Sequence, residues 1–186
     1  MRLELASRRL ALTTIEARYP GAMVLDLTSR GPDPWVRFSP FFPHGNIPVP
    51  DGSGRLAASV EGIWQGLKVF ESAGVDESKF EVESMRGLKR TLRRLGPCRA
   101  HLVNGRLLGY REARYALYLP AYRWVLDHRL APELAELARL AAAGPVVLLD
   151  YESNADPGDL RRPLSHAGLV IRYLTGDWPE STSARK

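Results

Sequence analysis

Hydrophobic residues recur at helical spacing most regularly in residues 59–73. Apolar side chains stand at positions i, i+3, i+4, i+7 and i+10, namely Val60, Ile63, Trp64, Leu67 and Phe70. This spacing is typical of an amphipathic helix that packs one face against a core. Ser59 suits the N-cap because its hydroxyl can accept a main-chain N–H, and Gly74 suits the end. The pattern predicts a helix over residues 59–73.

A second segment with helical spacing, residues 84–95, is basic on one side. Its apolar positions are Leu88, Leu92 and Leu95. The opposite side carries Arg86, Lys89, Arg90, Arg93 and Arg94. Five cations on one helix face could neutralise the phosphates of a nucleic acid, but a solvated outer face has the same composition. Both interpretations of this predicted helix stay open.

The rest of the chain alternates between predicted helices and strands. We expect helices over residues 6–19, from Pro120 to about Leu130, from Pro132 to Ala143, and from the N-cap Ser165 to about Leu174, with strands over residues 22–26, 35–38 and 145–150. The pair Asn104-Gly105 between two apolar runs predicts a hairpin over residues 100–110. Residues 39–54 are rich in proline and also apolar, which favours a loop packed against the body of the domain.

These elements indicate the α+β class, with helices packed around a small mixed or antiparallel sheet. The chain has 186 residues, of which 45% are hydrophobic and 25% are charged, as in ordinary globular proteins. This length suits a single domain with a substantial core. We expect that domain to extend over residues 1–180 and a polar tail to follow at 181–186.

Composition restricts the cellular compartment and the classes of partner that we expect. No apolar run reaches the roughly 18 residues of a membrane span, and no leader pattern opens the chain, so we expect a cytoplasmic protein without a membrane partner. The single cysteine, Cys98, excludes a disulfide framework within the chain, and the four histidines lack ligand spacing, so we expect no metal and no cofactor. A net charge of +5 favours an anionic partner, either a nucleotide-like small molecule or a nucleic acid.

The helix predicted over residues 59–73 also carries the best candidate chemistry. Glu61, Gln65 and Lys68 stand at i, i+4 and i+7, which places them on one polar stripe. Gly62 and Gly66 flank them, and each glycine inside a helix costs about 1 kcal/mol relative to alanine. Close helix packing or the close approach of a ligand would offset that cost. The alternative interpretation is an ordinary solvated face.

Two further positions could carry chemistry. The strand predicted over 145–150 ends at Asp150, and Tyr151, Glu152 and Asn154 follow it, which places polar groups at a sheet edge. Ordinary turn formation explains the same residues. His166 stands in the first turn of the last predicted helix, where an imidazole and main-chain amides could bind an anion. It could equally be an ordinary helix residue.

Two segments together resemble a known family. The segment Phe38-Ser39-Pro40-Phe41-Phe42-Pro43 resembles the F-S-N-F-x-P segment of NADAR-type N-glycosidases. Residues 59–70 resemble the S-x-E-x-x-x-Q-x-x-K-F helix of that family, with Glu61, Gln65 and Lys68 at the expected spacing. An Asp before the closing helix is a further family feature, and Asp150 occupies that place. This chain departs from the family at Pro40, where the family has Asn, at Gly62, where it has His, and after Asp150, where a Trp-Gly pair is absent.

The resemblance implies hydrolysis of the N-glycosidic bond between a ribose and a base, in a riboflavin-pathway intermediate or in ADP-ribosylated nucleic acid. It assigns Glu61 to the carboxylate that stabilises positive charge on the ribose or activates water, and Asp150 to a second acid. The remaining substrate-binding residues would be Ser39, Phe41, Trp64, Gln65, Lys68 and His166. A non-catalytic alternative is a nucleic-acid-binding or interaction module that uses the basic face of residues 84–95.

Overall fold

The structure, a computed structural model, describes residues 2–180 and shows two compact units. Unit 1 contains the described residues of 1–39 and 130–186, and unit 2 contains residues 40–129. Unit 2 is therefore inserted into the sequence of unit 1. The predicted tail at 181–186 lies outside the described residues. One domain over residues 1–180 stays a prediction, whereas the α+β class is confirmed by the mixture of helices and small sheets in both units.

Unit 1 is built on a parallel sheet of three strands. Its elements are β1 (Leu3–Ser7), α1 (Leu12–Arg18), β2 (Met23–Asp26), the 3₁₀ turn η1 (Trp35–Phe38), α6 (Ala131–Ala143), β8 (Val146–Asp150) and α7 (His166–Leu174). The strand order is β1-β8-β2, so the last strand in the sequence is the central one. All five residues of β8 are buried, as its uninterrupted apolar sequence predicts.

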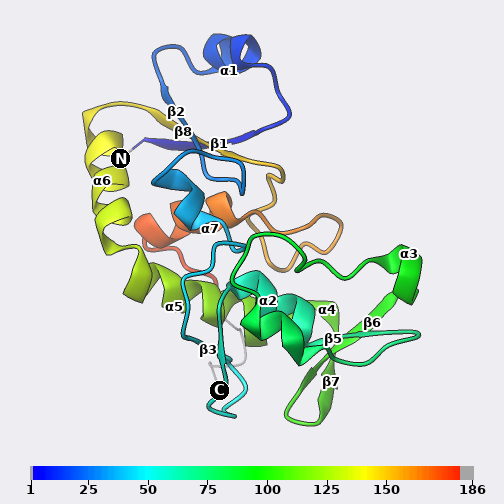
Figure 1. Ribbon diagram of the computed structural model, residues 1–186. Coiled ribbons are helices and arrows are strands. Elements are labelled where there is room, and N and C mark those ends of the chain that lie inside the picture. Colours follow the sequence, from blue (N-terminus) through cyan, green and yellow to red (C-terminus); the bar gives the residue numbers. More distant parts are fainter. Residues whose placement is uncertain (1, 181–186) are drawn as a thin grey trace. The chain divides into compact units, whose positions relative to one another are not determined.

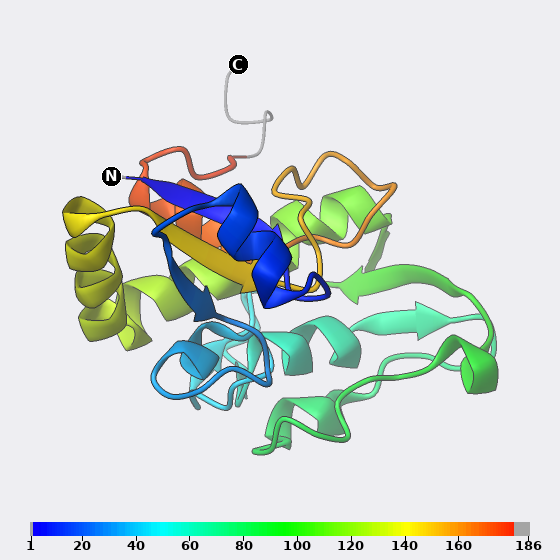
Figure 2. The same cartoon turned by 90° about the horizontal axis from the view of Figure 1, so that it is seen from above.

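Helices cover both faces of this sheet. Figures 1 and 2 show α1 on one side of the strands and α7 on the other. On the α1 side, Ile15 packs with Ala6, Val147 and Leu149 in one buried cluster. On the α7 side, Gly168 lies so close to β1 that an added Cβ would stand 3.3 Å from the Leu5 side chain. Helix α7 thus packs closely against the face of the sheet opposite α1.

Unit 2 contains the hairpin elements and the longest helical segment. Its elements are β3 (Ile47–Pro48), β4 (Leu56–Ala57), α2 (Val60–Gly66), β5 (Lys68–Phe70), η2 (Glu77–Glu81), α3 (Leu92–Leu95), β6 (Cys98–Val103), β7 (Arg106–Leu108), α4 (Tyr110–Ala113), the π turn η3 (Arg114–Tyr118) and α5 (Leu119–Arg129). Strands β3 and β4 pair with each other, and β5, β6 and β7 form a second antiparallel sheet. None of the helices within residues 2–180 has the length and apolar composition to cross a bilayer.

Several sequence predictions are confirmed by local geometry. Asn104 and Gly105 have φ angles of 50° and 74°, as a two-residue hairpin turn between β6 and β7 requires. The Ser165 side chain caps α7 by accepting the Gly168 N–H at 3.0 Å. Helix α6 and strand β8 lie where the pattern placed them. The loop over residues 39–54 is packed, because Ile47 within it is fully buried.

Four predicted elements are wrong in type or extent. Residues 6–19 contain the end of β1 and the short helix α1 instead of one helix, and residues 35–38 form a 3₁₀ turn instead of a strand. The helix predicted over 59–73 ends at Gly66, because the following residues pair with β6. The helix expected to begin at Pro120 belongs to a helical segment that already begins at Tyr110.

A fifth correction concerns the basic segment. Only Leu92–Leu95 are helical within residues 84–95, so the five basic residues do not share one helix face. Gly87 has a φ of 75°, which interrupts a right-handed helix. Leu88 is buried and Leu92 is 63% exposed, although the predicted helix would have buried both. Tertiary contacts of this segment outweigh its helical pattern.

Candidate functional site

Helix α2 holds the central residues of the candidate site, and its first turn is fixed by packing. Ser59 caps the helix by accepting the Gly62 N–H at 3.0 Å. A Cβ added to Gly62 would stand 2.6 Å from the Lys79 carbonyl oxygen, and one added to Gly66 would stand 2.5 Å from the Phe80 ring. The two glycines therefore allow close packing of α2 on η2. This packing offsets the unfavourable helix propensity of glycine. It also explains why a larger residue cannot replace Gly62 without movement of the main chain.

Glu61 and Gln65 form a buried pair on one side of α2. Glu61 is 7% exposed and Gln65 is 4% exposed. The Gln65 Nε2 donates to Glu61 Oε1 at 2.7 Å, and the Gln65 Oε1 accepts the main-chain N–H of Arg90 at 3.2 Å. The amide of Gln65 is thus oriented by Arg90 and directs its donor at the carboxylate. The i, i+4 relation predicted from the sequence is confirmed.

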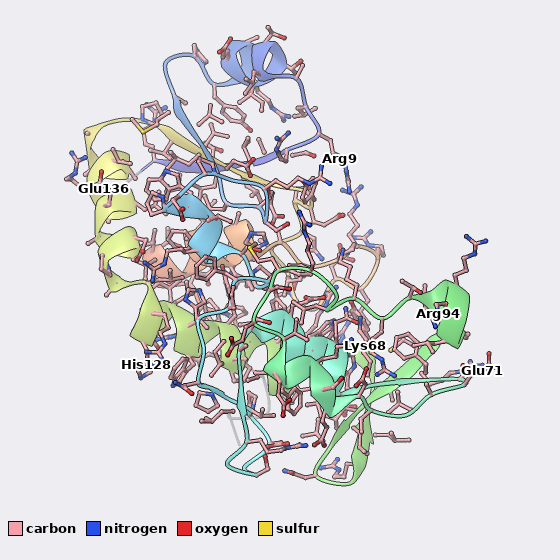
Figure 3. The ribbon with its side chains drawn as sticks, viewed as in Figure 1. Arg9, Lys68, Glu71, Arg94, His128 and Glu136 are labelled. Atoms are coloured by element: carbon pink, nitrogen blue, oxygen red, sulfur yellow. The ribbon has the colours of Figure 1, made fainter. Side chains whose placement is uncertain are left out.

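Lys68 reaches the same cluster from a different element than predicted. It lies on strand β5, directly after the end of α2, and is not part of the helical stripe. Its Nζ stands 5.7 Å from the centre of the Trp64 ring. Burial lowers the pKa of Lys68, while the negative charge of Glu61 opposes that shift. The three polar residues of the predicted stripe therefore interact, although only two of them share the helix. Figure 3 shows Lys68 beside α2.

An aromatic cluster completes the surroundings of Lys68. The Trp64 ring lies 3.9 Å from the His101 ring, 5.3 Å from the Tyr110 ring and 5.8 Å from the Tyr118 ring, measured between ring centres. Trp64 is 7% exposed, so the interpretation of this residue as part of the core is confirmed. The sequence reasoning missed His101 and Tyr110. His101 reaches the cluster from β6, where only the strand register that pairs it with Lys68 reveals it, and Tyr110 reaches the cluster from the start of α4.

The two segments that resemble NADAR-type enzymes meet at Glu61. The main-chain N–H of Glu61 donates to the carbonyl oxygen of Pro40 at 2.8 Å. Next to Pro40, the Phe41 ring lies 5.3 Å from the Nζ of Lys89. Segments some twenty residues apart in the sequence are thereby joined at the main chain of Glu61. Ser39 belongs to unit 1, where it is 2% exposed.

Of the five residues on the predicted basic face, one is half-buried and four are exposed. The guanidinium of Arg90 donates to the carbonyl oxygens of Lys68 at 2.8 Å and Gly74 at 2.7 Å, so it stabilises the turn around β5. The exposed residues are Arg86, Lys89, Arg93 and Arg94. Figure 3 shows Arg94 on α3, near Glu71 and away from α2.

The excess positive charge of the chain is confined to unit 2. Unit 2 has fourteen Lys and Arg residues against nine Asp and Glu, whereas unit 1 has twelve of each. Residues 84–114 alone contain nine basic residues and a single acidic one, Glu112. The net charge of +5 is thus a local property of the unit that holds Glu61.

Asp150 and His166 come together in unit 1, at the point where β8 ends and α7 begins. The Asp150 Oδ2 accepts from Ser165 Oγ at 2.7 Å and from His166 Nδ1 at 3.0 Å. The other ring nitrogen of His166 lies 2.8 Å from the carbonyl oxygen of Leu27. Since a carboxylate and a carbonyl both accept, this geometry suits an imidazolium with a proton on each nitrogen.

The pKa shifts of this pair agree with that assignment. Burial acts to raise the pKa of Asp150, but the charge and hydrogen bonds of its neighbours, His166 first, lower it overall. Burial acts to lower the pKa of His166, but the charge and hydrogen bond of Asp150 raise it overall. The contacts tie the central strand to the closing helix. The predicted catalytic role of Asp150 and the substrate-binding role of His166 stay predictions.

A cavity of about 590 Å³ lies in unit 1, in the loop between β8 and α7. Its lining residues are Ser153, Asn154, Ala155, Asp156, Asp159, Arg161 and Arg162. None of the predicted site residues lines it, and its carboxylates are occupied by local turn and ion-pair contacts. We therefore assign the candidate site to the buried charged residues of unit 2 and not to this cavity. Within residues 2–180, no group of three His, Cys, Asp or Glu side chains is arranged to hold a metal ion.

Comparison with known proteins gives a family without an assigned activity. The model of a family of unknown function, DUF6939, matches residues 7–170, so the chain belongs to this family. No curated protein and no solved structure matches the chain.

Proposed function

We propose that this member of DUF6939 hydrolyses the N-glycosidic bond between a ribose and a base, with Glu61 as the catalytic carboxylate. The proposal extends the resemblance to NADAR-type N-glycosidases. The observation that carries it is the 2.8 Å hydrogen bond between the Glu61 main chain and Pro40, which joins the two resembling segments at the residue whose carboxylate is buried. Neither segment alone would suggest this chemistry.

The reaction suits a carboxylate in this setting. Breakage of the bond between C1′ and the base nitrogen builds positive charge on the ribose, which a nearby carboxylate stabilises. Water adds its hydroxyl group to C1′, Glu61 accepts the remaining proton of the water, and this proton then passes to the base nitrogen, so that the base leaves with a proton in place of the ribose. The Gln65 donor holds the carboxylate in one orientation. In this proposal Lys68 would bind a phosphate of the substrate or adjust the basicity of Glu61.

Hydrolysis of a panel of N-ribosides tests the proposal. The panel includes an aminopyrimidine ribotide of the riboflavin pathway and ADP-ribosylated guanine in DNA, and release of the base is measured. We expect Glu61→Gln to lower kcat by roughly 10²- to 10⁴-fold, the usual contribution of a positioned acid or base. Glu71→Gln, on an exposed carboxylate of the same unit, is the matched control and should retain activity. Turnover that survives Glu61→Gln would contradict the role of Glu61.

A nucleic-acid-binding module is the second candidate, favoured by the charge of residues 84–114. Phosphate contacts make the logarithm of the affinity fall linearly with the logarithm of the salt concentration. We expect Arg93→Ala with Arg94→Ala to weaken binding of single-stranded DNA and to reduce that slope. Arg161→Ala, an exposed arginine of unit 1, should change neither. An affinity that does not vary between low and physiological salt would remove this candidate.

The cytoplasm is the compartment that we propose for either function. This proposal rests on the single cysteine and on the expected nucleotide or nucleic-acid partner. Neither function requires a metal or a cofactor.

A further inference from the structure

His101 is a buried histidine that the chemistry proposed above does not use. It lies on β6, and its cross-strand partner is Lys68 on β5. Cross-strand partners project from the same face of a sheet, so the two side chains are neighbours. The side chain of His101 is fully buried against Trp64. It therefore belongs to the same cluster as Glu61, Gln65 and Lys68.

Both ring nitrogens of His101 are buried, and neither makes a hydrogen bond of normal geometry within residues 2–180; a weaker contact joins the ring to the main chain of Trp64. Each such group costs about 1–3 kcal/mol, and proteins satisfy most of them. Phenylalanine would fill a similar volume without this cost. An imidazole whose N–H donor and acceptor nitrogen make no normal hydrogen bond within the protein suits a residue that binds a ligand.

The protonation state of His101 indicates the kind of ligand. Burial lowers the pKa of His101 to about 3, the charge of Lys68 adds to this effect, and the main chain of Trp64 opposes it. The ring is therefore neutral at physiological pH, with one N–H donor and one acceptor nitrogen. A phosphate or carboxylate would need donors or positive charge, which Lys68 supplies. The neutral imidazole instead matches a heteroaromatic base, which presents a donor and an acceptor on its edge.

Tyr110 is the ring that such a base would displace in order to contact His101. It is 41% exposed, and it is the most exposed of the four clustered rings. Its ring stands in edge contact with Trp64 at 5.3 Å and with His101 at 6.2 Å. A planar heterocycle in place of the Tyr110 ring would touch both. Exposed side chains change rotamer within nanoseconds, and such a change would take the Tyr110 ring away from Trp64, His101 and the Arg114 guanidinium.

We propose that His101 is a substrate-binding residue that recognises the base of the substrate, which occupies the position of the Tyr110 ring beside Trp64. The inference rests on the proposed function, because it names the part of the substrate that the Glu61 site holds. It assigns the base to His101 and the phosphate to Lys68, on neighbouring strands.

Calorimetric titration tests this assignment without any need for turnover. Guanosine 5′-monophosphate and cytidine 5′-monophosphate carry a base, and ribose 5-phosphate is the probe without one. We expect the wild-type protein to bind at least one nucleotide, and His101→Phe to bind it about ten- to hundredfold more weakly, as the loss of one or two hydrogen bonds implies. Binding of ribose 5-phosphate should not change.

The matched control is His128→Phe, the same change on a ring that also contacts a tryptophan, Trp124. It should bind nucleotides as the wild type does. Thermal unfolding gives a second readout, since His101→Phe removes unpaired groups and should melt no lower than the wild type. Tyr110→Ala, at an exposed position, should bind nucleotides at least as tightly as the wild type.

Three outcomes would overturn the inference: nucleotide affinity unaffected by His101→Phe, weaker binding by Tyr110→Ala, or a wild-type protein that binds neither nucleotide. Failure of the proposed function is distinguishable from these. Nucleotide binding that depends on His101, without hydrolysis of any N-riboside, would refute the glycosidase and leave the base-binding role intact. Hydrolysis that is unaffected by His101→Phe would do the reverse.

Discussion

At the scale of single residues, Gln65 shows how a short-range pattern fixes a functional geometry. Its spacing of four from Glu61 places the amide over the carboxylate, and a helix of only two turns is sufficient. The sequence could predict this pair because both residues belong to one local element. It could not predict His101, which no local pattern connects to α2 and which only the register of β5 and β6 brings there.

The buried, neutral His101 makes stability depend on pH. Its pKa is about 3 in the folded chain and about 6.5 when unfolded, so only the unfolded state binds a proton between these values. This contribution to stability is absent above pH 6.5 and becomes increasingly unfavourable as the pH falls towards 3, by up to about 1.4 kcal/mol per unit. Urea unfolding at several pH values should therefore show His101→Phe gaining stability over the wild type below pH 6.5. A constant difference across that range would contradict the buried neutral state.

Asp150→Asn should destabilise unit 1 by roughly 3–5 kcal/mol, because it leaves a buried imidazole without its counter-charge. The raised pKa of His166 adds stability that is fully present below its unfolded value of 6.5 and is lost as the pH rises through its folded value. The variant should lose this dependence. Denaturant unfolding with Asp177→Asn, an exposed carboxylate of the same unit, as the control measures the effect. Equal stability of the two variants would show that the buried contacts contribute little.

At the scale of elements, local signals predicted those elements whose ends are determined locally. The Ser165 cap, the Asn104-Gly105 turn and the apolar run of β8 each stand within a few residues of the structure they specify. Predictions failed where distant partners decide the conformation. Residues 68–70 follow α2 with helical spacing, but pairing with β6 draws them into a strand. Residues 84–91 have a helical pattern, but the side chain of Arg90 binds main-chain carbonyls instead.

Helix α2 also gives a test of its close packing. Gly62→Ala would bring a Cβ to 2.6 Å from the Lys79 carbonyl, so the main chain of η2 must move. We expect a loss of about 1–3 kcal/mol in unfolding free energy, despite the higher helix propensity of alanine. Gly74→Ala, where an added Cβ meets nothing within 4 Å, is the control and should be near neutral. A stabilised Gly62→Ala variant would mean that α2 packs less tightly on η2.

At the scale of the whole molecule, the interrupted sequence of unit 1 has a measurable consequence. Strands β1 and β2 each pair with β8 and not with each other. A fragment of residues 1–129 therefore lacks the strand that joins them. We expect hydrogen exchange of the fragment to find β1 and β2 unprotected, whereas the full chain protects both. Protection of β1 in the fragment would mean that another segment can replace β8.

The late position of β8 in the sequence also determines how long β1 and β2 lack their partner strand during synthesis. About 120 residues separate the end of β2 from the start of β8. At roughly 5–20 residues per second, a ribosome needs about 6–24 s to produce them. During that time the apolar side chains of β1 and β2 have no sheet partner, while the complete sequence of unit 2 emerges and can fold. The nascent chain thus presents its earliest strands to chaperones and to neighbouring chains until almost the last segment has been translated.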